Sequence, residues 1–131
     1  MDKLAFLKPF IIFEIMNCPY CGKQAELKDS SIIYGRSYGL VYICQDFPKC
    51  DSFVGVHKGT HTPLGRMANK ELREWKKLAH FYFDGAWKRA KVSRDRAYRT
   101  LAVKMGLPIE KAHIGMFDVE QCKRVVEIFK Q

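Results

Sequence analysis

Four cysteines stand in two pairs in the first half of the chain, and they constrain its fold more than any other feature. Cys18 and Cys21 are separated by two residues and Cys44 and Cys50 by five, with 22 residues between the pairs. Two short turns that each give two thiolates to one tetrahedral ion are typical of a zinc ribbon. We therefore expect these four cysteines to bind one Zn²⁺ ion. Such a site has no coordination position left for water or substrate, which argues against catalysis at the metal.

Other uses of these cysteines stay open. Disulfide bonds suit secreted chains, and nothing in the sequence resembles a secretory signal. A redox Cys-x-x-Cys opens a helix, whereas Pro19 and Gly22 favour a turn with a positive φ at the glycine. His57 and His61 have the spacing of a zinc finger, but if they joined the first pair, the second pair would be idle. Iron is the alternative metal for four thiolates.

The chain is basic, and most of its excess positive charge lies in the second half. The net charge of the 131 residues is +9. Residues 1–60 carry seven Lys and Arg against six Asp and Glu, whereas residues 66–104 carry twelve against four. A segment of this density is typical of a protein that binds a polyanion, although a solvated helix face has a similar composition. We favour a nucleic-acid partner.

The densest group of cations lies at residues 88–99, where Asp95 is the only acidic residue among six Lys and Arg. These charges repel one another unless an anion or solvent screens them. We expect this stretch and the preceding helix to contact phosphates, which positions a protein without reading sequence. Ribbon aromatics can stack on unpaired bases, although Tyr42 and Phe53 are expected in the core. The candidate residues for nucleic-acid binding are Arg73, Lys76, Lys77, Lys88, Arg89, Lys91, Arg94, Arg96, Arg99 and Tyr38.

The first half has the pattern of a small antiparallel sheet. Residues 25–29, 30–34, 40–43 and 52–56 alternate in polarity or are rich in β-branched and aromatic side chains, as strands are. Residues 35–39 have the composition of a hairpin turn. We therefore expect a ribbon of three or four strands that the metal clamps at one end.

The second half has the pattern of helices. One helix is expected over about 69–90, a second between the N-cap Ser93 and Gly106, and a third from Asp118, where a capping box begins. Cys122 is expected to be a buried thiol of the third helix. The side chains expected on the inner face of the first helix are Leu72, Trp75, Leu78, Ala79, Tyr82 and Trp87.

These patterns predict an α+β fold with an N-terminal antiparallel zinc ribbon packed against a C-terminal helical subdomain of about three helices. We divide the chain into an N-terminal extension (1–16), a zinc ribbon (17–62) and a basic helical subdomain (63–131). The apolar extension is too short and too interrupted for a membrane span, so a strand or part of a helix is expected there, and Met16 is an alternative start. Free thiols without a membrane segment indicate a reducing, cytoplasmic setting with no membrane partner.

Residues 18–51 carry a pattern found in a known class of zinc ribbon. Cys-Pro-Tyr-Cys-Gly at 18–22 is followed by Gly39 and by a closing Cys-x-x-Phe-Pro-x-Cys at 44–50. This pattern resembles the zinc ribbons at the C-terminal end of bacterial type IA topoisomerases. Those ribbons help to bind single-stranded DNA through an aromatic and basic surface, so the resemblance implies nucleic-acid binding by analogy of fold.

Further motifs extend over nearly the whole chain. They are Cys-Pro-Tyr-Cys-Gly (18–22), Ile-Tyr-Gly-Arg-Ser-Tyr-Gly (33–39), Val-Gly-Val-His-Lys-Gly-Thr (54–60), Ala-Tyr-Arg-x-Leu-Ala (97–102) and His-Ile-Gly-Met-Phe (113–117). With them the chain from Cys18 onward resembles a small family of zinc-finger-containing proteins of unknown function from phage and bacterial genomes. This resemblance implies a metal and little mechanism. Many members have a shorter second cysteine spacing than the five residues here.

We expect a zinc-binding, non-catalytic protein that binds DNA or RNA with low sequence specificity. The alternative is a phage-type effector that binds a host protein complex, and a nuclease is the least favoured function. The sequence has no convincing pair of carboxylates at metal spacing, no convincing Ser/His/Asp set and no convincing phosphate-binding glycine loop. The loop at 56–61 holds His57, Lys58, Thr60 and His61 and has the groups for acid–base chemistry, but capping the ribbon is its favoured role.

Overall fold

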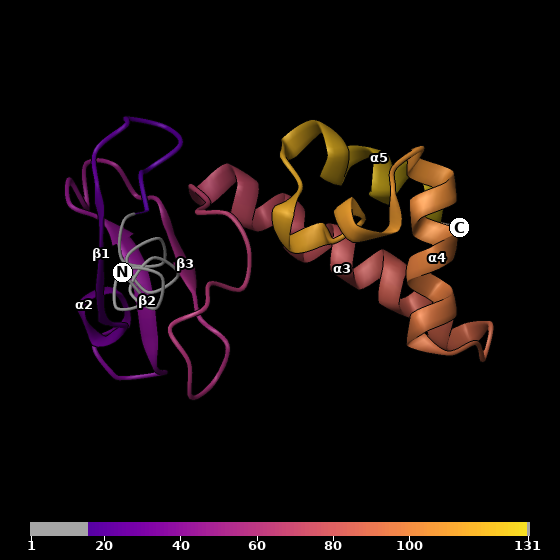
Figure 1. Ribbon diagram of the computed structural model, residues 1–131, viewed down its shortest axis with the longest axis horizontal. Coiled ribbons are helices and arrows are strands. Elements are labelled where there is room, and N and C mark those ends of the chain that lie inside the picture. The colour runs from indigo at the N-terminus through magenta and orange to yellow at the C-terminus, as the bar shows by residue number, and fades with distance from the viewer. Residues whose placement is uncertain (1–15, 131) are drawn as a thin grey trace, which may run out of the picture. The chain divides into compact units, whose positions relative to one another are not determined.

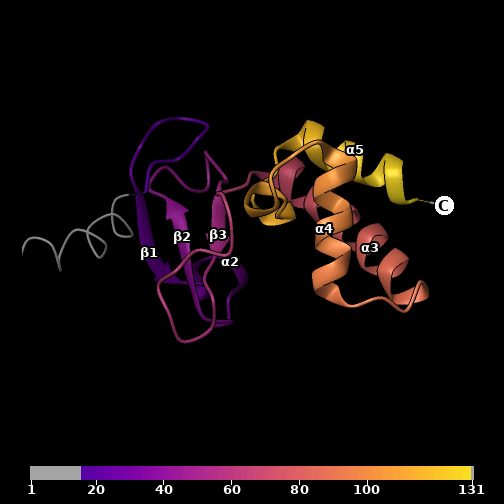
Figure 2. The same ribbon diagram turned by 45° about the vertical axis from the view of Figure 1, so that its right-hand side comes forward.

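The computed structural model of the chain describes residues 16–130. The chain divides into two compact units, Met1–Lys70 and Glu71–Gln131. The first unit holds a small sheet and the second holds most of the helices, as Figures 1 and 2 show from two directions. This order confirms the predicted α+β class. The predicted N-terminal extension lies outside the described residues, except for Met16.

The sheet of the first unit has three antiparallel strands. β1 (Ala25–Asp29), β2 (Leu40–Cys44) and β3 (Phe53–Gly55) follow the order β1-β2-β3 (Figure 1). Successive side chains of a strand point to opposite faces, and the four residues 41–44 of the central strand are all buried. Both faces of β2 are therefore covered by other parts of the unit.

The two faces of the sheet carry two separate apolar clusters. One contains Cys18, Ala25, Tyr42, Cys44, Val54 and Met67, and the other contains Val41, Ile43 and Phe53. The exposed fraction is 1% for Tyr42 and 8% for Phe53, which confirms that both rings belong to the core. Because Cys18 and Cys44 belong to the first cluster, the metal-binding end of the ribbon is part of the same apolar core as the sheet.

The prediction of a strand at residues 30–34 is wrong. Ser31–Tyr34 form α2, a single helical turn that ends at Gly35 with φ of 76°. The carboxylate of Asp29 accepts hydrogen bonds from the Ser31 N–H and the Ser37 hydroxyl, both at 2.8 Å. Such local bonds give the backbone an alternative to strand pairing, and they outweigh the β-branched composition here.

The segment at residues 63–69, which the sequence analysis grouped with the helices, pairs with the third strand. Phe53 and Ala68 exchange two backbone hydrogen bonds of 3.1 and 3.0 Å, and the Leu64 N–H donates to the Gly55 carbonyl at 2.9 Å. The segment thereby covers the free edge of β3, and edge strands are commonly protected in this way.

Three helices form the second unit. They are α3 (Lys70–Arg89), α4 (Arg94–Met105) and α5 (Val119–Phe129), with two 3₁₀ turns at Ile109–Lys111 and Ile114–Met116 between the last two. Among residues 16–130, none of the helices combines the length and the apolar composition that a membrane span requires.

The predicted helix ends are confirmed by their capping bonds. The Ser93 hydroxyl accepts the Arg96 N–H at the start of α4, and Gly106 ends that helix with φ of 68°. Asp118 and Gln121 form a capping box at the start of α5, with bonds of 2.8 and 3.0 Å. These bonds satisfy N–H groups that have no partner within the helix.

The inner face of α3 differs in part from the prediction. Leu72, Ala79 and Phe83 are buried, whereas Leu78 is 42% exposed. Steps of seven and four residues keep the buried side chains on one stripe, and Leu78 lies about 100° around the helix from Ala79. Cys122 has no exposed surface, which confirms its prediction as a buried thiol.

Candidate metal centre

The four cysteine sulfurs lie within 4.8 Å of one another. Cys18 Sγ is 3.6 Å from Cys50 Sγ, and Cys21 Sγ is 3.4 Å from Cys44 Sγ. Both distances are far above the roughly 2.05 Å of a disulfide bond, and all four thiols are free. Four sulfurs bound tetrahedrally at about 2.3 Å from one zinc lie about 3.8 Å apart. The cluster therefore has the dimensions of a tetrahedral metal site.

The first cysteine pair is held by a tight turn, the first knuckle (residues 18–22). The Gly22 N–H donates to the Cys18 carbonyl at 2.9 Å, and the Cys18 N–H donates to the Lys23 carbonyl at 2.8 Å. Gly22 has φ of 79°, as predicted from its place after the second cysteine. Glycine takes this conformation without steric cost, so the chain can return toward β1 directly after Cys21.

The second cysteine pair is held by a wider turn, the second knuckle (residues 44–50). The Phe47 N–H donates to the Cys44 carbonyl at 3.0 Å, and the Cys50 N–H donates to the Asp46 carbonyl at 3.1 Å. The Asp46 N–H also points to Cys44 Sγ at 3.4 Å. Two overlapping turns thus accommodate the spacing of five residues and still bring both sulfurs to the site.

Polar contacts join the second knuckle to the two residues that follow the first knuckle. Lys23 Nζ lies 3.4 Å from Asp46 Oδ1, and the Gln45 side-chain amide donates to the Gln24 carbonyl at 3.1 Å. The ion pair is exposed and contributes little stability by itself. Together, however, the contacts keep the two turns in register, which a four-ligand site requires.

The thiols differ in their readiness to lose a proton. Burial raises the pKa of Cys18, but N–H groups of Tyr20 and Cys21 donate to its sulfur, and the net effect lowers the pKa to about 7. Burial raises the pKa of Cys44, and burial with the adjacent Cys18 sulfur raises the pKa of Cys50 to about 12. A divalent ion would reverse this tendency, because a coordinating thiol is deprotonated outright.

A buried hydroxyl beside the cluster supports a thiolate site. Ser52 is fully buried, and its Oγ has no hydrogen-bond partner at bonding distance among the residues that the structure describes. The same hydroxyl lies near enough to the Cys18 sulfur to lower the pKa of that thiol. An unpaired buried hydroxyl is costly, whereas a hydroxyl that donates to a metal-bound thiolate is satisfied. Sequence reasoning missed Ser52, because nothing near it in sequence shows where its side chain lies.

The alternative ligand pair of His57 and His61 does not join the cluster. Within residues 16–130 the one group of metal-binding side chains consists of the four cysteines, and both histidines are exposed. The Tyr42 hydroxyl donates to the His61 carbonyl at 2.7 Å, and the Thr60 hydroxyl donates to the His57 carbonyl at 2.8 Å. The loop thus covers the ribbon through its backbone, in agreement with the favoured capping role.

The donor set fits one zinc ion. Four sulfur donors favour zinc, and a complete set of four protein ligands is typical of structural rather than catalytic sites. When bound, the ion would cross-link both knuckles and add its binding free energy to folding.

The candidate residues for nucleic-acid binding fall on both units. Tyr38 belongs to the first unit and is 67% exposed. The nine cations belong to the second unit, on α3, on α4 and on the turn that joins them, where Lys91 has φ of 57°. Arg99 pairs with Asp95 at 3.0 Å, and the Arg94 guanidinium lies 5.2 Å from the Tyr98 ring centre.

Comparison with known proteins adds one finding. A family model described as a zinc-finger-containing domain matches residues 14–131. The match includes all four cysteines and extends over most of the first compact unit and all of the second. No curated protein and no solved structure matches the chain.

Proposed function

The chain belongs to this zinc-finger-containing family, and on that premise we propose that it is a non-catalytic nucleic-acid-binding protein whose ribbon is folded around zinc. The bound ion stabilises the ribbon, and the basic helices contact phosphates. The contacts are with the backbone of the nucleic acid, so sequence preference is low. The proposal is supported most by the turn between α3 and α4.

This turn gathers positive charge that few carboxylates neutralise. Lys88, Lys91, Arg94 and Arg96 form no ion pair with any residue that the structure describes, and all four side chains are exposed. Asp95 is the one carboxylate within residues 88–99 and is paired with Arg99. A polyanion would relieve the repulsion among these cations and release its own counterions, which drives binding.

The absence of a catalytic role is part of the same proposal. A zinc ion held by four thiolates has no open position for water, so it supplies no nucleophile. His57 and His61 lie on a loop, and their carbonyl groups accept hydrogen bonds from the Tyr42 and Thr60 hydroxyls, as expected of a loop that caps the ribbon. No carboxylate is hydrogen-bonded to either imidazole in the described part of the chain, so neither is oriented as a general base.

The proposal is tested by measuring the affinity of the zinc-loaded protein for labelled DNA and RNA, each single- and double-stranded, over a salt series. We expect submicromolar dissociation constants at low salt and a steep linear dependence of their logarithm on the logarithm of salt. The triple substitution Arg94→Gln/Arg96→Gln/Arg99→Gln should reduce that slope by about 2 to 3, since each phosphate contact contributes about 0.7 to 0.9.

A matched control removes the same charge elsewhere. Lys104, Lys111 and Lys130 are exposed and lie outside residues 88–99, so their triple change to Gln should leave most of the slope intact. Equal effects of the two triple variants would show that net charge alone matters. Negligible binding at low salt would contradict the proposal and favour a protein partner, such as the host complex of a phage-type effector.

A further inference from the structure

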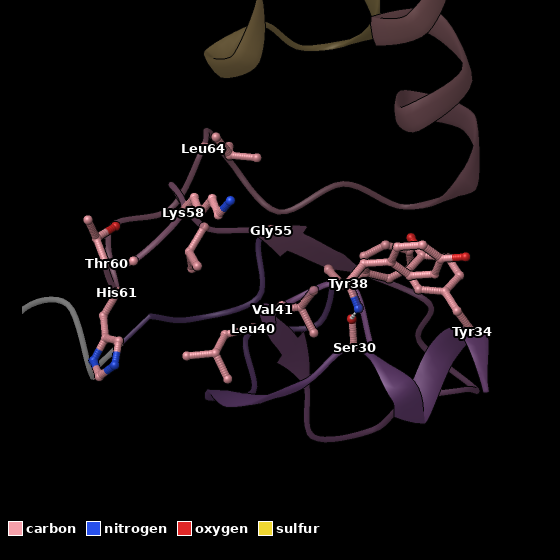
Figure 3. A pocket seen from close by; sticks show the side chains of 14 residues that line it. Ser30, Tyr34, Tyr38, Leu40, Val41, Gly55, Lys58, Thr60, His61 and Leu64 are labelled. Atoms are coloured by element: carbon pink, nitrogen blue, oxygen red, sulfur yellow. Dashed lines mark hydrogen bonds between the residues drawn. The ribbon is translucent and has the colours of Figure 1, made fainter. Parts of the chain in front are cut away.

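The first unit has a cavity of about 760 Å³ on the sheet, away from the cysteine cluster. The residues that line it from the strands include Val41, Phe53 and Gly55, and Figure 3 shows Tyr34 and Tyr38 close together at one side. Lys58, Thr60, His61 and Leu64 come from the loop that follows β3, and the same view shows Thr60 and His61 across the cavity from the tyrosines. The volume is within the range of small-molecule sites, so the cavity can hold a ligand group.

One sheet position at the cavity, Gly55, has no side chain. Gly55 lies opposite Val41 in the register of β2 and β3, and its φ is not in the left-handed region. A Cβ built on Gly55 would lie 3.4 Å from Leu64 Cδ1, which is an ordinary contact. The backbone therefore does not require glycine here, and a side chain at this position would contact the loop that lines the cavity.

Two tyrosine rings are displayed at the cavity. Tyr34 is 52% and Tyr38 67% exposed, and the rings meet edge to face with centres 5.5 Å apart. Tyr34 also lies edge to face with Phe53 at 6.3 Å, which connects the exposed rings to the core. Exposed, supported aromatic rings offer flat faces on which a planar ligand can stack.

The loop that carries the tyrosines is held in place before any ligand arrives. The buried Ser30 hydroxyl accepts the Tyr38 N–H at 2.7 Å, and Asp29 accepts both the Ser31 N–H and the Ser37 hydroxyl. These bonds order the loop in the unbound protein, so little conformational entropy of the loop is lost when a ligand binds.

The charge at the cavity is positive. Lys58 lines it, and no Asp or Glu is among its lining residues. The Arg36 guanidinium lies 5.5 Å from the centre of the Tyr38 ring, at the same side. Lys58 forms no ion pair with any described residue. Aromatic faces beside cations are the arrangement that binds a base together with its phosphate.

We propose that this cavity seats an unpaired base of single-stranded nucleic acid against Tyr34 and Tyr38, with Lys58 and Arg36 on the adjoining phosphates. A base within a duplex is stacked and paired and cannot enter a cavity, so the site selects single strands or unpaired regions. This inference rests on the proposed function and adds to it the strandedness of the partner and a second contact surface.

The test uses the full-length, zinc-loaded protein and a single strand that contains 2-aminopurine, whose fluorescence falls when it stacks on an aromatic ring. We expect quenching with the single strand and weaker binding of the same strand in a duplex. Tyr38→Ala should weaken single-strand binding by about tenfold, in line with the loss of one stacked base, and should reduce the quenching. Lys58→Ala and the cavity-filling change Gly55→Val should weaken it as well.

Two controls separate the cavity from the rest of the ribbon. Ile32→Ala removes an exposed apolar side chain of α2 that does not line the cavity, and Lys49→Ala removes an exposed lysine of the second knuckle. Both should bind like the wild type. Melting temperature and zinc content, measured for every variant, identify any change that acts through folding.

Each result has a distinct meaning. Equal affinity for single strand and duplex, or unchanged binding by folded Tyr38→Ala and Gly55→Val, would overturn the cavity as a base site. If the Arg94/Arg96/Arg99 triple variant still lost affinity in that case, the proposed nucleic-acid-binding function would stand and only the base site in the cavity would be rejected. No binding of any nucleic acid by the wild type would overturn both, and binding of a peptide in place of an oligonucleotide would do the same.

Discussion

The Sγ atoms of Cys18 and Cys50 lie 3.6 Å apart, although 32 positions separate the residues in the chain. The antiparallel pairing of β1 with β2 brings the two knuckles to the same end of the sheet, with Ala25 opposite Cys44. One ion at this point closes a long loop, and closing long loops restricts the unfolded chain most. Zinc is therefore expected to act on the stability of the whole first unit.

Replacement of either residue should release the metal. Cys18→Ser and Cys50→Ser are each expected to lower bound zinc well below one ion per chain and to abolish the cooperative melting of the ribbon, because binding free energy is folding free energy in such sites. Metal analysis and thermal denaturation measure both effects. Cys122→Ala, which changes a thiol buried in the second unit, is the control and should keep its zinc. A Cys18 or Cys50 variant with wild-type melting and metal content would disprove the assignment.

Zinc affinity should fall as the pH falls. In the metal-free chain burial raises the pKa of Cys44, and burial with the Cys18 sulfur raises the pKa of Cys50 to about 12, so both thiols are protonated near neutrality. Each must release a proton to bind zinc, and Cys18, with its pKa lowered to about 7, adds another as the pH drops below that value. We expect the affinity to fall by roughly 100-fold or more per pH unit below pH 8. Competition with a coloured chelator at several pH values measures it, and a flat profile would contradict the proton release.

The Ser52 hydroxyl should strengthen metal binding. Ser52→Ala removes a buried donor near the Cys18 sulfur and is expected to weaken zinc affinity by about tenfold, as loss of a hydrogen bond to a metal ligand does. The competition assay at fixed pH measures the change, with Ser93→Ala in the second unit as a control for the assay. Unchanged affinity together with a higher melting temperature would mean that the hydroxyl is only an unsatisfied polar group.

The capping box of α5 should contribute measurably to the second unit. Asp118→Ala removes the acceptor of the Gln121 N–H and should lower the free energy of unfolding of the helical unit by about 1 kcal/mol. Asp118→Asn keeps an acceptor of similar shape and should restore most of the stability. Urea denaturation followed by circular dichroism provides the comparison, and equal stability of the Ala and Asn variants would rule out the cap as the cause.

The helical unit should lose stability in mild acid. Burial lowers the pKa of His80, with Asp84 opposing the shift and Lys76 and Arg94 reinforcing it. The unfolded chain then takes up a proton near pH 6.5 while the folded chain does not, so stability is complete above that pH and decreases below it. His80→Gln should reduce the difference in unfolding free energy between pH 7.5 and 5.5, and His113→Gln, at an exposed position, should not. The same acid sensitivity in all three proteins would exclude His80 as its source.

Local patterns predicted much of this molecule. The cysteine spacing indicated the ligand set that the structure brings together, and the caps at Ser93, Gly106 and Asp118 marked the helix ends correctly. Such signals depend on residues that are at most a few positions apart, where geometry follows from the backbone itself. The strand predicted at residues 30–34 failed because hydrogen bonds to Asp29 competed with composition.

From the amino-acid sequence alone, a metal-binding ribbon followed by basic helices could thus be predicted. The sequence did not establish that Ser52 lies by the Cys18 sulfur, that Phe83 rather than Leu78 faces inward, or that a cavity lies between the sheet and the loop that follows β3. These features arise when segments distant in sequence pack together, and burial is a property of the packed arrangement. Their positions had to come from the tertiary structure for that reason.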